Sequence, residues 1–184
     1  MVICFDLDNT LVDLEKPIKK IFKKHKLKYQ PAFDWELSNY PAHIKNEVLE
    51  MFKDSNVMCK LKPFYNAKKF IKSLKNKGFS IYIITARSKN IANETIEFVE
   101  KLFDVPCFVV KPNQSKLSML KKLKADFWID DCPTHLNDYR KNGIYSTMIS
   151  NKNTPYNHYM RDKVGWLKNI NELYKLYKKN IFIY

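Results

Sequence analysis

The chain lacks any apolar run of about 18 residues, so we expect no membrane-spanning helix. It also lacks a signal-peptide pattern, because its first apolar segment is interrupted by Asp6 and Asp8 and has no basic start. These absences predict a cytoplasmic protein. Apolar residues make up 45% of the 184 positions, which is enough for one substantial core and argues against disorder.

The sequence also lacks closely spaced cysteine pairs of the kind that bind metal ions. The four cysteines, Cys4, Cys59, Cys107 and Cys132, show no spacing that is typical of a metal site. Cys4 and Cys107 lie in predicted buried strands, which favours reduced thiols that pack like small apolar residues. Cys132 borders an acidic pair and is therefore the one candidate for a reactive thiol, although a carboxylate nucleophile fits the surrounding residues better.

Arginine is scarce in a strongly basic chain. The net charge is +14, yet the only arginines are Arg87, Arg140 and Arg161. Such basicity is typical of proteins that attract phosphate or nucleic acid. Solvated surface charge is the competing interpretation, because the lysines are spread over many predicted helix faces instead of forming one block.

Two carboxylates, Asp6 and Asp8, follow the apolar run of residues 2–5, with Asn9 and Thr10 where the chain should turn. Strand alternation places both carboxylates on one side if the chain stays extended. Two close carboxylates repel each other unless a cation or a proton offsets the charge, and Mg²⁺ prefers oxygen ligands. One aspartate could then attack phosphorus while the other transfers protons. The alternative is a simple Asx turn.

Two later strands also end in polar residues. The predicted strand 79–84 leads into Thr85, Ala86 and Arg87, and the predicted strand 126–129 leads into Asp130 and Asp131. Taken alone, a threonine at a strand end can cap a turn, and an acidic pair can cap a helix. The lysines on the path between these two strands are Lys111, Lys116 and Lys121.

Strands alternate with helices through most of the chain, which predicts an α/β protein with a doubly wound parallel sheet. Strands are expected at 2–6, 79–84, 107–110, 126–129 and 144–149. Helices are expected at 66–78, 90–102, 117–123 and 136–141. Gly78 and Gly143 follow two of these helices, as helix-ending glycines do.

Residues 14–62 interrupt this alternation. Their apolar residues recur at helical spacing, which predicts a small helical insert between the first strand and the rest of the fold. Phe33, Trp35 and Tyr40 are candidates to stack on a nucleotide base if the insert covers the site. For each of these aromatic residues alone, a place in the core of the insert is the competing and favoured interpretation.

Four motifs follow one another along the chain: Asp6 with Asp8, Thr85, a lysine, and the pair Asp130 and Asp131. This ordered set resembles the motifs of the haloacid dehalogenase (HAD) superfamily of phosphohydrolases. The resemblance implies a Rossmann-like core of residues 1–13 and 63–184 and a type 1 helical cap of residues 14–62. It implies that Asp6 is the nucleophile and Asp8 the general acid and base. Thr85, Ala86 and Lys116 would hold the phosphate, and Arg87 is either a further substrate contact or a surface residue.

The resemblance also implies a Mg²⁺ cofactor. Its ligands would be Asp6, the backbone carbonyl of Asp8 and one member of the later acidic pair. We expect Asp131 to be the direct ligand and Asp130 to orient it, although the sequence leaves these two roles interchangeable.

The region after the acidic pair is similar to the 5′(3′)-deoxyribonucleotidases, the cytosolic type C 5′-nucleotidases. The similarity lies in Thr154–Asn157, Arg161 and the segment 164–167. It implies hydrolysis of small nucleoside monophosphates. A polynucleotide 3′-phosphatase is the alternative, because segment 128–143 also resembles that branch, but no Gly-x-x-x-x-Gly-Lys-Ser/Thr kinase motif occurs. A non-catalytic binding protein on a HAD fold is the second alternative.

Overall fold

The computed structural model describes residues 1–112, 114–149 and 169–179. The tail motifs at Thr154–Asn157, Arg161 and 164–167 lie outside the described residues. Within the described part, no helix combines the length and the apolar character that crossing a bilayer requires.

A parallel sheet forms the centre of the described chain. Its strands are β1 (Val2–Phe5), β2 (Ser80–Ala86), β3 (Cys107–Val110), β4 (Phe127–Asp130) and β5 (Tyr145–Met148). Their order across the sheet is β3-β2-β1-β4-β5, and every neighbouring pair is parallel. All five lie where strands were expected, so the predicted parallel α/β sheet is confirmed.

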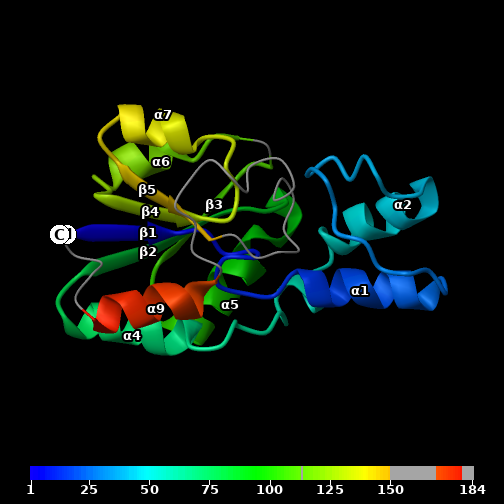
Figure 1. Cartoon of the computed structure of the whole chain (residues 1–184), viewed down its shortest axis with the longest axis horizontal. Coiled ribbons are helices and arrows are strands. Elements are labelled where there is room, and N and C mark those ends of the chain that lie inside the picture. The colour runs from blue at the N-terminus through cyan, green and yellow to red at the C-terminus, as the bar shows by residue number, and fades with distance from the viewer. Residues whose placement is uncertain (113, 150–168, 180–184) are drawn as a thin grey trace.

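Helices cover both faces of the sheet (Figure 1). The face drawn below the sheet holds α4 (Ala67–Asn76), α5 (Ala92–Phe103) and α9 (Ile170–Lys178), and the short 3₁₀ turn η1 (Lys89–Ile91) precedes α5. The opposite face holds α6 (Leu117–Lys122) and α7 (Leu136–Lys141). Helices on both faces require strands that are apolar on both sides, which explains the nearly continuous apolar runs of the strands.

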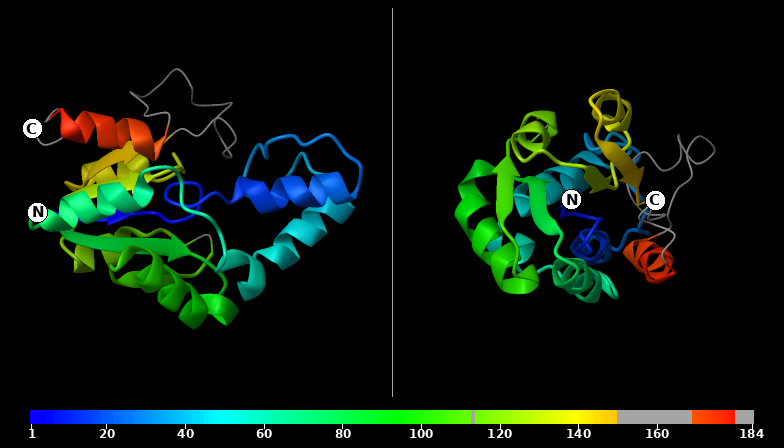
Figure 2. Two further views of the ribbon diagram at one scale, coloured as in Figure 1. Left: turned by 90° about the horizontal axis from the view of Figure 1, so that it is seen from below. Right: turned by 90° about the vertical axis from the view of Figure 1, so that its left-hand side faces the viewer.

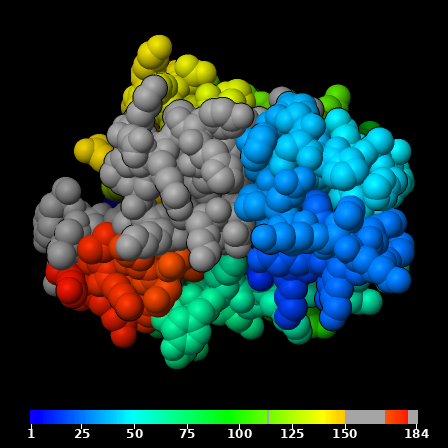
Figure 3. Space-filling view, turned by 45° about the vertical axis from the view of Figure 1, so that its right-hand side comes forward, coloured from blue at the N-terminus to red at the C-terminus, as the bar shows by residue number. Residues whose placement is uncertain are grey.

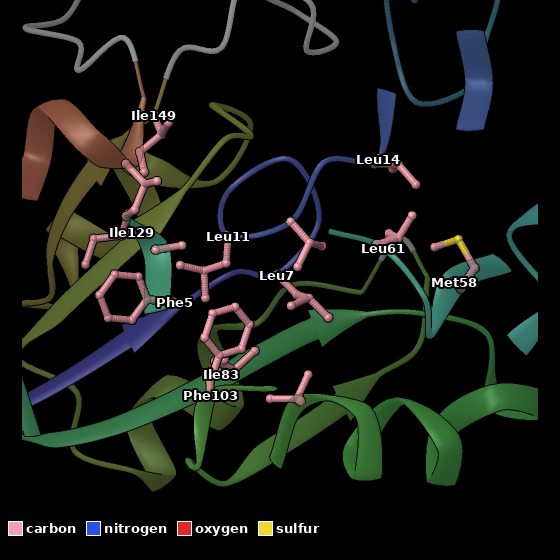
Figure 4. Close-up of a cluster of buried hydrophobic side chains, with 14 of the residues drawn as sticks. Phe5, Leu7, Leu11, Leu14, Met58, Leu61, Ile83, Phe103, Ile129 and Ile149 are labelled. Carbon is pink, nitrogen blue, oxygen red and sulfur yellow. The ribbon is translucent and has the colours of Figure 1, made fainter. Parts of the chain in front are cut away.

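The strand residues alternate between two hydrophobic clusters, one on each face. Phe5 packs with the α4 and α5 side, where its ring meets Phe70 edge to face at 5.9 Å. Trp128 belongs to the other cluster and meets Tyr139 of α7 in the same manner at 6.2 Å. The first cluster continues without a break to Met58 beyond the end of β1 (Figure 4). One apolar core therefore connects the sheet with the segment that precedes Pro63.

The segment 14–62 contains the helices α1 (Glu15–Lys24), α2 (Ala42–Met51) and α3 (Ser55–Met58). They project past the carboxyl ends of the strands (Figure 2, left) and form the blue and cyan side of the surface in Figure 3. The chain leaves and returns side by side, because the Asp13 amide donates to the Lys62 carbonyl (2.9 Å) and the Phe64 amide donates to the Leu11 carbonyl (2.9 Å). These two hydrogen bonds form a neck that joins residues 11–13 to residues 62–64.

Asn9 connects the turn after β1 with the first helix of the insert. Its backbone is left-handed (φ 57°), a conformation that asparagine tolerates better than most residues. Its side-chain amide donates to Glu15 Oε1 (3.1 Å), and its Oδ1 accepts from the Leu14 amide (3.3 Å). Tyr29 donates its hydroxyl to the other oxygen of Glu15. Burial raises the pKa of Glu15, although the hydrogen bonds from Tyr29 and Asn9 oppose the shift.

The raised pKa of Glu15 predicts how stability changes with pH. The stability that this carboxyl contributes is fully present below its unfolded pKa of 4.5 and is lost as the pH rises through the higher folded pKa. In Glu15→Gln this group no longer titrates. We therefore expect the free energy of unfolding of the wild type, measured in urea titrations, to fall relative to that of the variant as the pH rises from 4.5 through the raised folded pKa.

Glu47→Gln is the matched control for this prediction. His25 and Lys24 lower the pKa of the partly exposed Glu47, so the stability difference between Glu47→Gln and the wild type should not show the same trend with pH. A stability difference between Glu15→Gln and the wild type that stays constant over this range would contradict the buried-charge interpretation.

Candidate active site

The polar residues expected at the site meet at the carboxyl edge of the sheet. Asp6 and Asp8 follow β1, Thr85 lies near the end of β2, Asp130 ends β4, and Lys116 lies immediately before α6. The chain runs from β1 through β2 to β3 on one side and then places β4 and β5 on the other side of β1. Ligands of open α/β sheets bind where the strand order reverses in this way.

Lys116 is the lysine that contacts the first aspartate. Its Nζ lies 2.6 Å from Asp6 Oδ1 and 3.5 Å from Asp130 Oδ2, and it sits 4.9 Å above the Trp128 ring. Burial would lower the pKa of Lys116, but Asp130 and Asp6 raise it above its ordinary value. The two competing lysines, Lys111 and Lys121, are exposed. Of the three candidates, only Lys116 is therefore held against the acidic cluster.

Three buried carboxylates form this acidic cluster. Asp6, Asp130 and Asp131 each offer an oxygen, and these oxygens lie within 4.8 Å of one another. Burial raises the pKa of Asp6 to about 7, with Asp130 and Asp8 adding to the shift and Lys116 opposing it. Burial and the neighbouring Asp6 also raise the pKa of Asp131 well above its ordinary value. One lysine cannot offset three carboxylates, so the cluster suits a hard divalent cation.

The two members of the acidic pair have different surroundings. Asp130 Oδ2 accepts from the indole Nε1 of Trp128 (3.0 Å), and its Oδ1 accepts from the backbone amide of Cys132 (3.1 Å). Asp131 Oδ2 is buried and has no hydrogen-bond partner among the residues that the structure describes. A buried carboxylate oxygen without a partner is unfavourable unless a ligand supplies the missing interaction. Asp131 therefore fits direct contact with a cation, while Asp130 is held in place by the protein.

Asp8 faces a different partner. Arg87 Nε donates to Asp8 Oδ2 (2.8 Å) and Arg87 Nη2 donates to Asp8 Oδ1 (2.7 Å), which is a two-point ion pair. The sequence left Arg87 open between a substrate contact and a surface residue. Its exposed fraction is only 3%, so Arg87 is not a surface residue. Thr85 Oγ1 lies 3.5 Å from the same Asp8 Oδ2, so Thr85, Asp8 and Arg87 form one polar group beside the cluster.

A cavity of about 590 Å³ opens onto these residues. This volume is in the range of small-molecule sites. One wall consists of the sheet residues described above, together with Ala86. The opposite wall is contributed by the insert and is mostly apolar; its residues are Leu14, Trp35, Glu36, Leu49, Phe52, Lys53 and Met58.

The three aromatic candidates of the insert lie in different places. Trp35 lines the cavity. Phe33 is 41% exposed and is not among the lining residues, so the structure does not bring it to the site. Tyr40 is buried, and its ring packs edge to face on Phe22 at 4.9 Å, which agrees with the competing interpretation of a core residue.

Sequence reasoning missed part of the apolar wall. Leu49 and Phe52 line the cavity and are only half-buried. Val48, the residue before Leu49 in α2, is fully buried. Adjacent apolar residues at 48 and 49 make the apolar face of this helix wider than packing against α1 requires. That excess width is the signal from which a second apolar surface could have been inferred.

Cys132 also lines the cavity, as its place beside the acidic pair suggested. Burial raises the pKa of its thiol to about 12, with Asp130 adding to the shift. A thiol that stays protonated at neutral pH is a poor nucleophile. The thiol of Cys132 is therefore a weaker candidate nucleophile than the carboxylates of the cavity.

Comparisons with known proteins agree with this geometry. The chain aligns with a HAD family hydrolase of Deinococcus radiodurans, whose structure holds phosphate and sodium, at a TM-score of 0.65 and 14% identity, over 99% of this chain and 97% of that one. It also aligns with a predicted phosphatase of Clostridium acetobutylicum at a TM-score of 0.59 and 18% identity, over 97% and 98%. These likenesses identify the fold as that of the HAD superfamily.

The sequence comparisons are more specific. The model of the family described as "5′ nucleotidase, deoxy (Pyrimidine), cytosolic type C protein" matches residues 1–178. A Bacillus cereus protein named "Putative nucleotidase" is 30% identical over 150 residues, which are 72% of this chain and 77% of that protein. The fold and the site thus define a HAD-superfamily hydrolase. Within that class, the chain belongs to the cytosolic type C 5′-nucleotidase family, and it is an enzyme of the phosphatase and nucleotidase class.

The unequal surroundings of Asp130 and Asp131 predict unequal effects on metal affinity. We expect Asp131→Asn to weaken Mg²⁺ binding more than Asp130→Asn, because it removes the charge of the carboxyl whose Oδ2 has no partner in the described part of the chain. Loss of an orienting residue typically lowers metal affinity about 10- to 100-fold, which sets the expected range for Asp130→Asn. Titration calorimetry with MgCl₂ measures both effects without any turnover.

Asp138→Asn, an exposed substitution in the first turn of α7, is the control and should leave Mg²⁺ affinity unchanged. Asp130→Asn as the more damaging of the two variants would reverse the assignment of the ligand.

Proposed function

We propose that this protein is a Mg²⁺-dependent 5′(3′)-deoxyribonucleotidase that hydrolyses (deoxy)nucleoside monophosphates through an aspartyl-phosphate intermediate. The observation that carries the proposal is the position of Asp6. Its carboxylate is buried at the end of β1, lies 2.6 Å from Lys116 Nζ, and opens onto a cavity with an apolar wall on its other side.

In the proposed first step, a carboxylate oxygen of Asp6 attacks the phosphorus of the bound monoester. A bond forms between that oxygen and phosphorus, and the bond from phosphorus to the ester oxygen breaks. Asp8 donates its proton to the departing oxygen, because an unprotonated alkoxide is a poor leaving group near neutral pH. In the second step Asp8 takes a proton from water as the water oxygen bonds to phosphorus. The bond between phosphorus and the Asp6 oxygen breaks, which releases inorganic phosphate and restores the Asp6 carboxylate.

Phosphate contacts in this proposal come from groups that line the cavity. The Thr85 hydroxyl, the backbone at Ala86 and the ammonium of Lys116 are the donors for the phosphoryl oxygens. Asp6, Asp131 and the backbone carbonyl of Asp8 would hold Mg²⁺, with Asp130 orienting the group. When bound, this ion would offset the negative charge of the phosphoryl group and the carboxylates.

A mononucleotide suits the cavity better than a strand of nucleic acid. The apolar wall includes Trp35 and Phe52, which offer aromatic surface to a base opposite the phosphate-binding side. The net charge of +14 is the observation that favours a polynucleotide 3′-phosphatase as the second candidate. That function requires an open basic groove along the backbone, whereas an apolar wall closes one side of this cavity.

Activity of the variant Asp6→Asn tests the nucleophile. An amide cannot form the aspartyl phosphate, so we expect turnover of a deoxyribonucleoside monophosphate to be lost while the circular dichroism spectrum is retained. EDTA should also abolish wild-type turnover, and added MgCl₂ should restore it. Phosphate release is the assay, and Asp13→Asn outside the cavity is the control. Near-normal turnover by Asp6→Asn would remove this residue from its proposed role.

Substrate size and salt separate the two candidate functions. We expect a higher kcat/KM for deoxyribonucleoside 5′- or 3′-monophosphates than for a 3′-phosphorylated oligonucleotide, and only a mild fall in rate as salt increases. An enzyme that tracks a nucleic-acid backbone loses affinity steeply with salt, because each neutralised phosphate releases counterions. Preference for the oligonucleotide together with a steep salt dependence would favour the polynucleotide phosphatase.

A further inference from the structure

Arg87 is buried, yet nearly all of its hydrogen-bonding capacity is used by the protein itself. Nε and Nη2 donate to the two oxygens of Asp8, and Nη1 donates to the Met58 carbonyl (3.0 Å). Nη1 also lies 3.5 Å from Thr95 Oγ1. A guanidinium has five N–H donors, and these four contacts leave at most one of them for a substrate. A phosphate-binding arginine would instead direct its two-point fork at the ligand.

Asp8 is held in one orientation by this arrangement. Two parallel hydrogen bonds from a planar guanidinium fix both the position and the plane of a carboxylate, which a single bond from an ammonium does not. Each carboxyl oxygen has two lone-pair sites. Arg87 and Thr85 both approach Oδ2, whereas Arg87 alone approaches Oδ1, so Oδ1 keeps a site at which a proton can be exchanged. Asp8 lines that cavity with 14% of its side chain exposed.

Arg87 is itself anchored from two other elements. Met58 is the last residue of α3 in the insert, and Thr95 lies in α5 behind the sheet. The Phe98 ring, also in α5, lies 5.9 Å from the guanidinium carbon. Because one anchor comes from the insert and the other two from α5, which packs against the sheet, the position of Arg87, and with it that of Asp8, depends on both parts of the fold.

From these contacts we infer that Arg87 is a positioning residue: it orients Asp8 for proton transfer to the leaving group and does not bind the phosphate of the substrate. This inference rests on the proposed phosphatase function and deepens it. Loss of Arg87 should therefore affect substrates differently, according to whether their leaving group needs a proton. Loss of the orientation must slow the release of a leaving group that needs a proton and must have little effect on one that does not.

The variant Arg87→Lys keeps the positive charge and removes the two-point contact. The experiment measures kcat/KM, which reports the steps up to phosphoryl transfer, for a deoxyribonucleoside monophosphate and for 4-nitrophenyl phosphate. The first substrate releases an alkoxide that requires protonation, and the second releases a stabilised phenolate. General acid catalysis contributes about 10²- to 10⁴-fold. We expect a loss of about 100-fold for the nucleotide and less than about 10-fold for the aryl ester, with KM unchanged for both.

A double-mutant cycle with Asp8→Asn tests whether Arg87 acts through Asp8. If it does, the double variant falls no further than Asp8→Asn alone, because an orienting residue has nothing left to orient. Arg140→Lys is the matched control. Arg140 donates to the Ser146 carbonyl away from the cavity, so this variant should retain the wild-type ratio of the two substrates.

Several outcomes would overturn the inference. Equal losses for the two substrates with a raised KM would make Arg87 a phosphate ligand. Equal losses with a lowered Tm and an unchanged KM would reduce its role to structural stability. Additive effects of Arg87→Lys and Asp8→Asn would show that the two residues act independently. Absence of turnover of any phosphate monoester by the wild type would be a different result, since it would refute the proposed function itself.

Discussion

The site depends on the close approach of negative charges at the carboxyl edge of the sheet. Asp6, Asp130 and Asp131 are buried within 4.8 Å of one another, and the Lys116 ammonium is the positive group in contact with Asp6 and Asp130. Taking carboxylates out of water is costly unless opposite charges accompany them. The carboxylates are buried where the strand order of the sheet reverses. Their negative charge favours the binding of a cation, which in turn attracts anionic ligands.

The environment of each carboxylate separates its role from that of its neighbours. Asp130 is hydrogen-bonded to Trp128 and to a backbone amide, and Asp8 is paired with Arg87. Asp131 has a buried oxygen that meets no partner among the described residues. Groups of the same chemical type thereby become candidates for three different roles: an orienting residue, a cation ligand and a proton donor. Hydrogen-bond geometry around the carboxylates, not their identity, makes this distinction.

The insert completes the site from the other side. Two backbone hydrogen bonds, Asp13 to Lys62 and Phe64 to Leu11, hold the two segments of its neck together. The side chain of Asn9, in the turn after β1, donates to Glu15 at the start of α1. The insert contributes an apolar wall to a cavity whose opposite wall is charged. A ligand with one anionic end and one aromatic end is complementary to this division, as a nucleoside monophosphate is.

The sequence by itself determined the parallel sheet, the helical character of the insert and the positions of Asp6, Asp8, Thr85 and the acidic pair at strand ends. These features follow from local patterns, because apolar runs predict buried strands and the residues after parallel strands share one edge. Only the tertiary structure decided which lysine meets Asp6, that Arg87 is buried against Asp8, and that Phe33 lies away from the cavity. It also decided which acidic residue has an oxygen with no partner in the described ranges. Those outcomes depend on distances between segments such as β1 and α6, which are 110 residues apart at the Asp6–Lys116 contact, and no local pattern encodes such distances.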